Sequence, residues 1–88
     1  MNGVEFDGYD AARNALLEAK GLRYANLLDP KNAGWSTTAK ADLLSQADRQ
    51  VKAAGGTPIE WHVAEQAALD RMRNFLPPQI ILIFEPPI

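Results

Sequence analysis

The chain has 88 residues and a formal net charge of −2, with no cysteine and one histidine. Its length supports one domain with a single modest core. Its composition excludes a disulfide framework, a cysteine nucleophile and a thiolate or multi-histidine zinc site. A metal would therefore be held by carboxylates and carbonyls, as Mg²⁺, Mn²⁺ or Ca²⁺ are. The longest strong apolar run, Ile80–Phe84, is far shorter than the roughly 20 residues of a membrane helix, and we expect no membrane partner.

The first third of the chain predicts two strands. Gly3–Asp7 alternates apolar and acidic side chains, which is typical of a half-buried strand. Gly8–Asp10 indicates a turn, because glycine and aspartate tolerate turn dihedrals, and Ala11–Asn14 is expected to continue it as a loose connection. Ala15–Gly21 is predicted as the second strand from its terminal glycine and hairpin-like spacing, although its alanines and leucines would suit a helix equally well.

The middle third predicts a loop and a long helix. Leu22–Trp35 has no clear period, so we expect a surface loop with one turn of helix over Tyr24–Leu28. Apolar residues at helical spacing predict a helix over Thr37–Ala54, which the pair Gly55-Gly56 ends. The candidates for its N-cap are Ser36, Thr37 and Thr38.

The last third predicts a strand, a helix and a strand. Ile59–Val63 alternates cleanly, with Ile, Trp and Val on one face and Glu60 and His62 on the other. A helix is expected over Ala64–Leu76 before two prolines, and the apolar run Gln79–Phe84 is typical of a strand covered on both faces. The fold class is therefore α/β (α+β), with two helices flanking a small mixed sheet of about four strands in the order β-β-α-β-α-β and parallel right-handed crossovers between the last three strands.

Glu18 and Lys20 are two residues apart on the second predicted strand, so their side chains share a face. Leu17 and Ala19 are then expected to pack inward, while Glu18 and Lys20 line a polar cleft. With Asp7 from the neighbouring strand, these groups form a candidate hydrolytic centre, because carboxylates hold a hard divalent cation and a lysine stabilises an anion. The alternatives are an exposed ion pair of little energetic weight and an aspartate that opens a turn.

Other side chains have weaker claims to a site. Gln46 and Gln50 are one helical turn apart and share a face at the edge of the apolar stripe, over the sheet, with a solvent-exposed helix surface as the alternative. Arg49 and Lys52 are candidate phosphate contacts, with an exposed helix face that has no function as the alternative. His62 is a candidate catalytic or DNA-contacting group, with a structural role as the alternative. Tyr9 and Tyr24 could stack on bases or close the cleft, with packing as the alternative.

Four strings of the sequence carry a resemblance by their order, namely Val4–Tyr9, Leu17–Gly21, Gln46–Gln50 and Pro58–Glu65. With Asp7 on the first strand and Glu18-x-Lys20 on the second, the chain resembles the PD-(D/E)xK core of restriction-endonuclease-like enzymes. More closely, it resembles the fifth restriction-endonuclease-fold toxin family of bacterial polymorphic toxin systems. The resemblance runs from Gly3 to Pro86.

This resemblance implies a set of site residues. Asp7, Glu18 and the backbone carbonyl of Ala19 would hold Mg²⁺ (or Mn²⁺). Lys20 would orient or help to deprotonate the attacking water, or stabilise the transition-state charge. A helical polar pair, here Gln46 and Gln50, would support the metal site or the water.

The resemblance also implies a metal-dependent DNase toxin with a cognate immunity protein. Residues 1–88 would form one nuclease domain, the C-terminal part of a longer effector made in the bacterial cytoplasm. Secretion machinery such as the type VI system, or a chaperone, would act through the parent chain and deliver it to the cytoplasm of a competing cell. Such cores usually begin with a helix before the first strand, for which this chain leaves no room. The acidic net charge argues against tight passive nucleic-acid binding, and the alternatives are a non-catalytic protein-interaction module and an RNase on the same fold.

Overall fold

The computed structural model describes residues 7–22, 24–29, 31 and 33–86. Its elements in chain order are β1 (Gly8–Asp10), β2 (Ala15–Lys20), α1 (Tyr24–Leu27), α2 (Ala33–Ala54), β3 (Ile59–Val63), α3 (Gln66–Arg73) and β4 (Ile80–Phe84). The predicted fold class and element order are confirmed, and α1 is the single turn of helix expected in the loop after β2. None of the helices in the described ranges is both long and apolar enough to cross a lipid bilayer.

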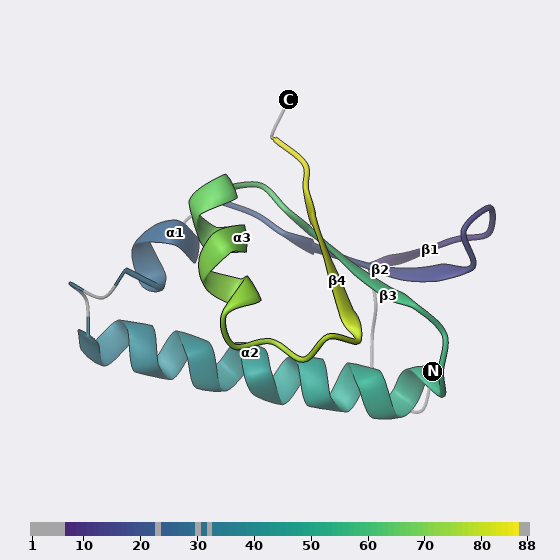
Figure 1. Ribbon diagram of the computed structural model, residues 1–88, viewed down its shortest axis with the longest axis horizontal. Coiled ribbons are helices and arrows are strands. Elements are labelled where there is room, and N and C mark those ends of the chain that lie inside the picture. Colours follow the sequence, from purple (N-terminus) through teal and green to yellow (C-terminus); the bar gives the residue numbers. More distant parts are fainter. Residues whose placement is uncertain (1–6, 23, 30, 32, 87–88) are drawn as a thin grey trace.

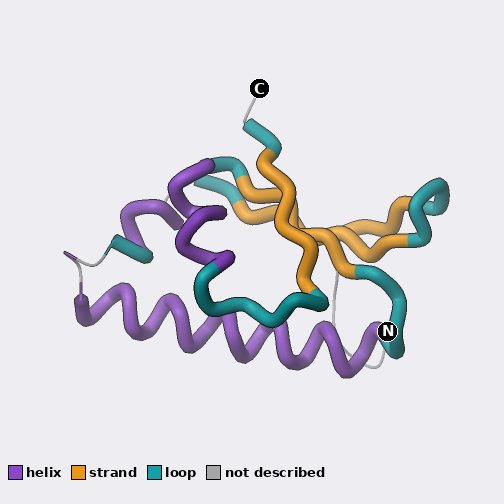
Figure 2. Tube along the Cα trace, in the orientation of Figure 1, coloured by secondary structure: helices purple, strands orange, loops and turns teal. Residues whose placement is uncertain are grey.

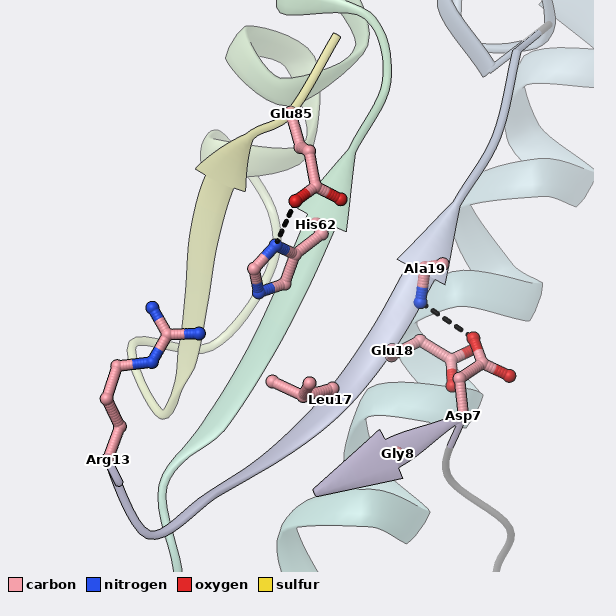
Figure 3. A pocket seen from close by; sticks show the side chains of 8 residues that line it. All are labelled: Asp7, Gly8, Arg13, Leu17, Glu18, Ala19, His62 and Glu85. Carbon is pink, nitrogen blue, oxygen red and sulfur yellow. Dashed lines mark hydrogen bonds and ion pairs between the residues drawn. The ribbon is translucent and has the colours of Figure 1, made fainter. Parts of the chain in front are cut away.

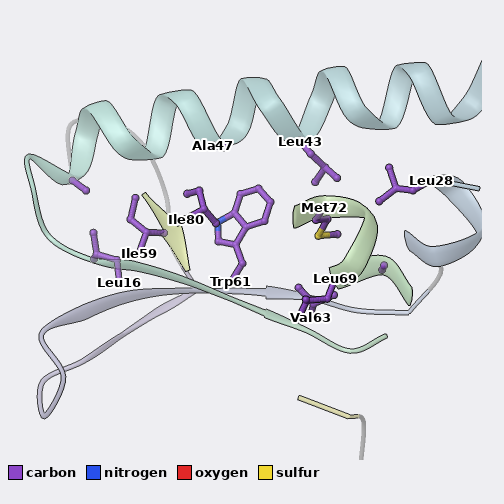
Figure 4. Packing of buried hydrophobic residues seen from close by; sticks show 12 residues of the cluster. Leu16, Leu28, Leu43, Ala47, Ile59, Trp61, Val63, Leu69, Met72 and Ile80 are labelled. Carbon is purple, nitrogen blue, oxygen red and sulfur yellow. The ribbon is translucent and has the colours of Figure 1, made fainter. Parts of the chain in front are cut away.

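The strands form one mixed sheet in the order β1-β2-β3-β4. β1 and β2 pair antiparallel, whereas β2 with β3 and β3 with β4 pair parallel, as expected for strands joined through helices. Helices α2 and α3 lie on the same side of this sheet (Figures 1, 2 and 4). We call that side the covered face, and we call the opposite side, on which no described helix lies, the open face.

The hydrophobic core fills the space between the covered face and the two helices (Figure 4). Trp61 lies at its centre and is fully buried. The alternation predicted for β3 is correct, since Ile59, Trp61 and Val63 all project into the core. The other large members of this cluster are Leu16, Leu28, Leu43, Leu69, Met72 and Ile80. Burial of such side chains is the main favourable term for a domain of this size.

The first turn lies later in the chain than predicted. Of the strand expected over Gly3–Asp7, only Asp7 lies within the described residues, and β1 occupies Gly8–Asp10, where a turn was expected. The turn instead spans residues 11–14, because the Asp10 carboxylate accepts hydrogen bonds from the backbone N–H groups of Ala12 and Arg13, at 3.0 and 3.3 Å. This shift puts Asp7 directly before β1.

Helix α2 begins at Ala33, four residues before the predicted start at Thr37. The hydroxyl residues expected to cap it therefore lie inside its first turns. Thr38 Oγ1 donates to the carbonyl of Gly34 one turn earlier, at 3.3 Å, and Ser36 Oγ donates to the carbonyl of Leu28 at 3.4 Å. Both hydroxyls are satisfied by carbonyl acceptors, so neither has to cap the helix.

Two C-terminal predictions need correction. Helix α3 covers Gln66–Arg73 and is shorter than the expected Ala64–Leu76, since Glu65 has extended dihedrals and Asn74 begins a turn before the prolines. Strand β4 is not covered on both faces, because Ile81 and Phe84 are each 44% exposed. Both crossover helices lie on one side of the sheet, which leaves this edge strand accessible.

Candidate functional site

Glu18 and Lys20 project toward the covered face. In the parallel register Glu18 pairs with Trp61 and Lys20 with Val63, and paired residues of neighbouring strands project to the same side of a sheet. Trp61 and Val63 are core residues, so the two charged residues of β2 are buried with them. The sharing of a face was predicted correctly.

The prediction that Leu17 and Ala19 pack inward is wrong. Leu17 is only half-buried and Ala19 is exposed on the open face. The reason is the register with β3, whose large apolar residues decide which face the helices cover. Because that register pairs Glu18 with Trp61, the charged side chains follow the tryptophan beneath the helices, and Leu17 and Ala19 turn away from them.

Three side chains close a hydrogen-bonded triangle beneath α2, which we call the polar triangle: Glu18, Lys20 and Gln46. Lys20 Nζ donates to Glu18 Oε2 at 3.0 Å and to Gln46 Oε1 at 2.5 Å, and Gln46 Nε2 donates to Glu18 Oε2 at 2.6 Å. A buried ion pair is tolerated when additional hydrogen bonds satisfy its members. Gln46 supplies both a donor and an acceptor, so it completes the pair.

Two aromatic rings also lie close to the Lys20 ammonium. Its Nζ lies 4.7 Å from the centroid of the Trp61 ring and 5.9 Å from that of Tyr24, both within the range of cation–π attraction. An ammonium has three donors, and Glu18 and Gln46 engage two of them. The position of Lys20 is thus fixed by β2, β3, α1 and α2 together.

Asp7 approaches the triangle from the start of β1. Its backbone N–H donates to the carbonyl of Leu17 at 3.0 Å, and its Oδ2 accepts from the N–H of Ala19 at 2.7 Å. Asp7 directly precedes Gly8, which the antiparallel register pairs with Leu17, the residue before Glu18. Asp7 and Glu18 both line the pocket shown in Figure 3.

The backbone of Ala19 points toward Asp7. On β2, Leu16 and Lys20 use their backbone groups to pair with the β3 side, at Pro58 and Ala64, and alternate residues of a strand direct these groups to opposite neighbours. The N–H and the carbonyl of Ala19 therefore both face Asp7. Two carboxylates and one carbonyl are oxygen donors of the kind that Mg²⁺ takes together with several waters.

These oxygen donors fit one cation that keeps several of its waters, because they do not form a larger cluster of metal-binding side chains. Within residues 7–86, as far as the structure describes them, no group of three or more His, Cys, Asp or Glu side chains could hold a metal. The hydrogen bonds of the described residues engage Oδ2 of Asp7 and Oε2 of Glu18. The second oxygen of each carboxylate is not used in these bonds and is the atom that could bind a cation.

Gln50 lies apart from the polar triangle. Its side chain is fully buried, and its Oε1 accepts the indole N–H of Trp61 at 2.8 Å. Its Nε2 has no hydrogen-bond partner among the described residues. The two glutamines predicted as a pair therefore contact different groups. Gln46 contacts the charged side chains of β2, and Gln50 contacts the indole of Trp61.

A pocket of about 290 Å³ runs across the open face beside Asp7 and Glu18 (Figure 3). Its lining comprises Asp7, Gly8, Arg13, Leu17, Glu18, Ala19, His62 and Glu85. His62 was named from the sequence, and its Nε2 lies 3.0 Å from Glu60 Oε1 while its Nδ1 lies 3.5 Å from Glu85 Oε1.

Arg13 and Glu85 were missed by the sequence analysis. Arg13 contacts two carboxylates, Asp10 at 2.9 Å and Glu60 at 3.0 Å. The spacing Asp10-x-x-Arg13 across a turn could have indicated the first of these contacts, whereas no local signal indicates the reach of Glu85 to His62. Desolvation acts to raise the pKa of Asp10, but the backbone hydrogen bonds and positive charge of Arg13, together with the Ala12 N–H, outweigh it and lower that pKa.

The remaining candidates lie away from this pocket. Arg49 donates to Ser45 Oγ at 2.7 Å, and Lys52 pairs with Asp48 at 3.0 Å on the exposed side of α2. Tyr9 donates through its hydroxyl to Asn14 within the first hairpin. None of these residues contacts the polar triangle.

Residues 1–66 match the family described as restriction endonuclease fold toxin 5. The matched range holds Asp7, Ala19, Gln50 and the whole polar triangle, and it ends at the first residue of α3. Comparisons with curated proteins and with solved structures find no match.

Proposed function

Because the chain belongs to the restriction endonuclease fold toxin 5 family, which indicates a nuclease toxin, we propose that it is a metal-dependent DNase. The observation that carries the proposal is that Asp7 contacts the backbone of Ala19, which lies between Glu18 and Lys20, whose carboxylate and ammonium are themselves paired. Hydrolysis of a phosphodiester needs a positioned water and neutralisation of the charge that develops on the phosphate. The cation would supply Lewis-acid polarisation and a water of lowered pKa.

The chain's own residues have distinct roles in this proposal. Asp7, Glu18 and the Ala19 carbonyl would hold Mg²⁺ or Mn²⁺. Lys20 would direct its third N–H, the one not taken by Glu18 or Gln46, toward the attacking water or a phosphate oxygen. Gln46 would hold Lys20 and Glu18 in register through the polar triangle. Gln50 would act from the core, by fixing the indole on which Lys20 rests.

The biological setting is part of the same proposal. Nucleic acid is also present in the producing cell, so the toxin would require a cognate immunity protein. Residues 1–88 would be a single nuclease domain at the C-terminus of a longer effector. That effector would be made in the bacterial cytoplasm and exported by a contact-dependent route such as type VI secretion. Secretion machinery or a chaperone would act on the parent chain. The toxin would be active in the cytoplasm of a competitor.

A plasmid-cleavage assay tests the proposal. Supercoiled DNA is incubated with the wild type and with Glu18→Gln, in MgCl₂ or MnCl₂ and with EDTA. We expect wild-type nicking that EDTA abolishes, and a loss of about 100-fold or more in Glu18→Gln, since metal-assisted stabilisation is worth several kcal/mol. Asp48→Asn, which removes an exposed carboxylate on α2, is the matched control and should cleave normally.

Two results would contradict the proposal: full activity in Glu18→Gln, or cleavage that persists in EDTA. A parallel reaction with single-stranded RNA separates the substrates, because cleavage of RNA alone would make the protein an RNase. No cleavage of either polymer, with circular dichroism of a folded protein, would favour a non-catalytic interaction module.

A further inference from the structure

Helix α1 is a single turn that cannot satisfy its own backbone. The N–H of Ala25 is in the first turn of a helix, where no intrahelical acceptor exists. The carbonyl of Ala25 would pair with the N–H of Asp29 in a longer helix, but that N–H donates to the carbonyl of Asn26 at 3.2 Å. Ala25 thus needs one acceptor and one donor from elsewhere in the chain.

Two oppositely charged residues at α3 supply both partners. Glu65 Oε1 accepts from the Ala25 N–H at 3.2 Å, and Arg71 Nη1 donates to the Ala25 carbonyl at 2.6 Å. The carboxylate meets the N–H side of α1 and the guanidinium its carbonyl side, which is the favourable arrangement for the helix dipole. Both contacts join residues at least 40 positions apart in sequence, so they report tertiary placement of α1.

Glu65 makes this contact in place of a local one. It is the N-cap residue of α3, yet its side chain makes no cap hydrogen bond to its own helix. Next to it, the N–H of Ala64 donates to the carbonyl of Lys20 at 2.9 Å. The junction between β3 and α3 therefore holds both ends of the segment from Lys20 to Ala25, at the end of β2 and in α1.

Tyr24 lies on this held segment, with its ring facing the Lys20 ammonium at 5.9 Å. We propose that Glu65 and Arg71 are positioning residues: by clamping Ala25 they hold α1 so that Tyr24 packs against Lys20. The effect on catalysis rests on the proposed nuclease function, whereas the clamp itself is a structural statement that can be measured separately. Neither residue touches the polar triangle, so both would act on the centre through Tyr24.

The clamp is tested first without an activity assay. We expect Glu65→Ala to speed hydrogen exchange of the Ala25 amide by about tenfold or more, since that N–H loses its acceptor, and Glu65→Gln to preserve slow exchange, because its amide oxygen still accepts. In the same NMR spectra, Glu65→Ala and Arg71→Ala should remove the ring-current shift of the Lys20 ε-methylene that Tyr24 causes. Asp70→Ala and Arg73→Ala, which change exposed residues of α3, are the matched controls.

The effect on catalysis is tested with the same variants in the plasmid assay. Glu65→Ala and Arg71→Ala should lower kcat about tenfold or more with little change in KM, because a misplaced catalytic group costs rate rather than binding. Tyr24→Leu should cause a similar loss, and Glu65→Ala combined with Tyr24→Leu should lose no more than either alone, since both act through one contact. Glu65→Gln should restore the wild-type kcat.

The outcomes separate the clamp from the nuclease. Unchanged exchange of the Ala25 amide in Glu65→Ala overturns the clamp. Faster exchange with an unchanged kcat overturns the positioning role, as do additive losses in the Glu65→Ala, Tyr24→Leu double variant. A folded wild type that cleaves nothing refutes the proposed function alone, and the Lys20 ring-current shift then still decides whether Glu65 and Arg71 place Tyr24.

Discussion

The carboxylate of Glu18 and the ammonium of Lys20 lie 3.0 Å apart beneath α2, with only 11% and 6% of their side chains exposed. A pair on an exposed strand face would contribute almost nothing to stability. Here the desolvation cost has already been incurred on folding, so each charge depends on the other and on Gln46. The centre that would bind a cation is therefore also a part of the core.

Lys20→Met tests this dependence. The substitution keeps the length of the side chain but leaves the Glu18 carboxylate buried without its counter-charge, and we expect a loss of about 3 kcal/mol in the free energy of unfolding. Adding Glu18→Gln should recover most of that loss, because the uncompensated charge is gone. Urea denaturation monitored by tryptophan fluorescence measures both.

Lys52→Met is the matched control for this substitution. Its ion pair with Asp48 is on the exposed side of α2, with 76% and 63% of the side chains accessible. The expected change is at most about 0.5 kcal/mol. Equal losses in the two lysine variants would contradict the buried role of Lys20.

The placement of the candidate site could be predicted only in part from the sequence. The two-residue spacing of Glu18 and Lys20 requires a shared face on any strand, so that prediction needed no tertiary information. Which face the helices cover depends on the register between β2 and β3, which pairs Glu18 with Trp61. That register is a long-range property, and local alternation around Leu17 therefore predicted the wrong packing.

The boundaries of the predicted strands, turns and helices were likewise only partly predictable from the sequence. The strand Ile59–Val63 was predicted correctly because its alternation continues over its whole length. The first turn was misplaced because Gly8 and Asp10 are both acceptable turn residues, and only the hydrogen bonds of Asp10 to the following backbone decide between them. The hydroxyl of Ser36 could likewise cap a helix or make a buried contact. Only its hydrogen bond to the Leu28 carbonyl shows that it makes the buried contact.

Substitutions of the two glutamines should separate their roles. Gln46→Ala opens the polar triangle, so we expect a fall in nuclease rate of about tenfold or more, because Lys20 and Glu18 lose the group that orients them. Gln50→Ala leaves the Trp61 indole N–H without its acceptor and creates a void in the core. It should cost about 2–4 kcal/mol in stability. The folded fraction should lose less rate than Gln46→Ala does, because Gln50 acts on Lys20 only through Trp61.

The comparison requires both variants to be measured below their melting temperatures. Plasmid cleavage at low temperature gives the rate, and urea denaturation gives the stability of each. Ser45→Ala, at an exposed position beside Gln46, controls for loss of a side chain on α2. If Gln50→Ala lost more rate and less stability than Gln46→Ala, the assignment of their roles would be reversed.

The first hairpin should lose stability in acid through Asp10. Its pKa is lowered in the folded chain, so its stabilising contribution is present above the ordinary aspartate pKa and is lost as the pH falls through the lowered value. The difference in melting temperature between the wild type and Asp10→Asn should therefore be largest near neutral pH and vanish in acid. Thermal unfolding from about pH 6 to about pH 2 measures it, with Asp48→Asn as the control. A difference that persisted at the acidic end would show that the charge of Asp10 is not its source.

Cation binding should stabilise the folded chain even where no substrate is present. A ligand that binds only the native state at 100 times its Kd adds about 2.7 kcal/mol to the free energy of unfolding. We therefore expect the melting temperature of the wild type to rise with added MgCl₂ or MnCl₂, and Asp7→Asn to abolish that rise, because it removes the carboxylate that contacts the Ala19 backbone. Asp29→Asn, which removes a carboxylate at the end of α1, should respond to the metals as the wild type does. A rise that survived in Asp7→Asn would place the cation elsewhere, and Asp7 would then be an aspartate that orders the start of β1 through its hydrogen bond from Ala19.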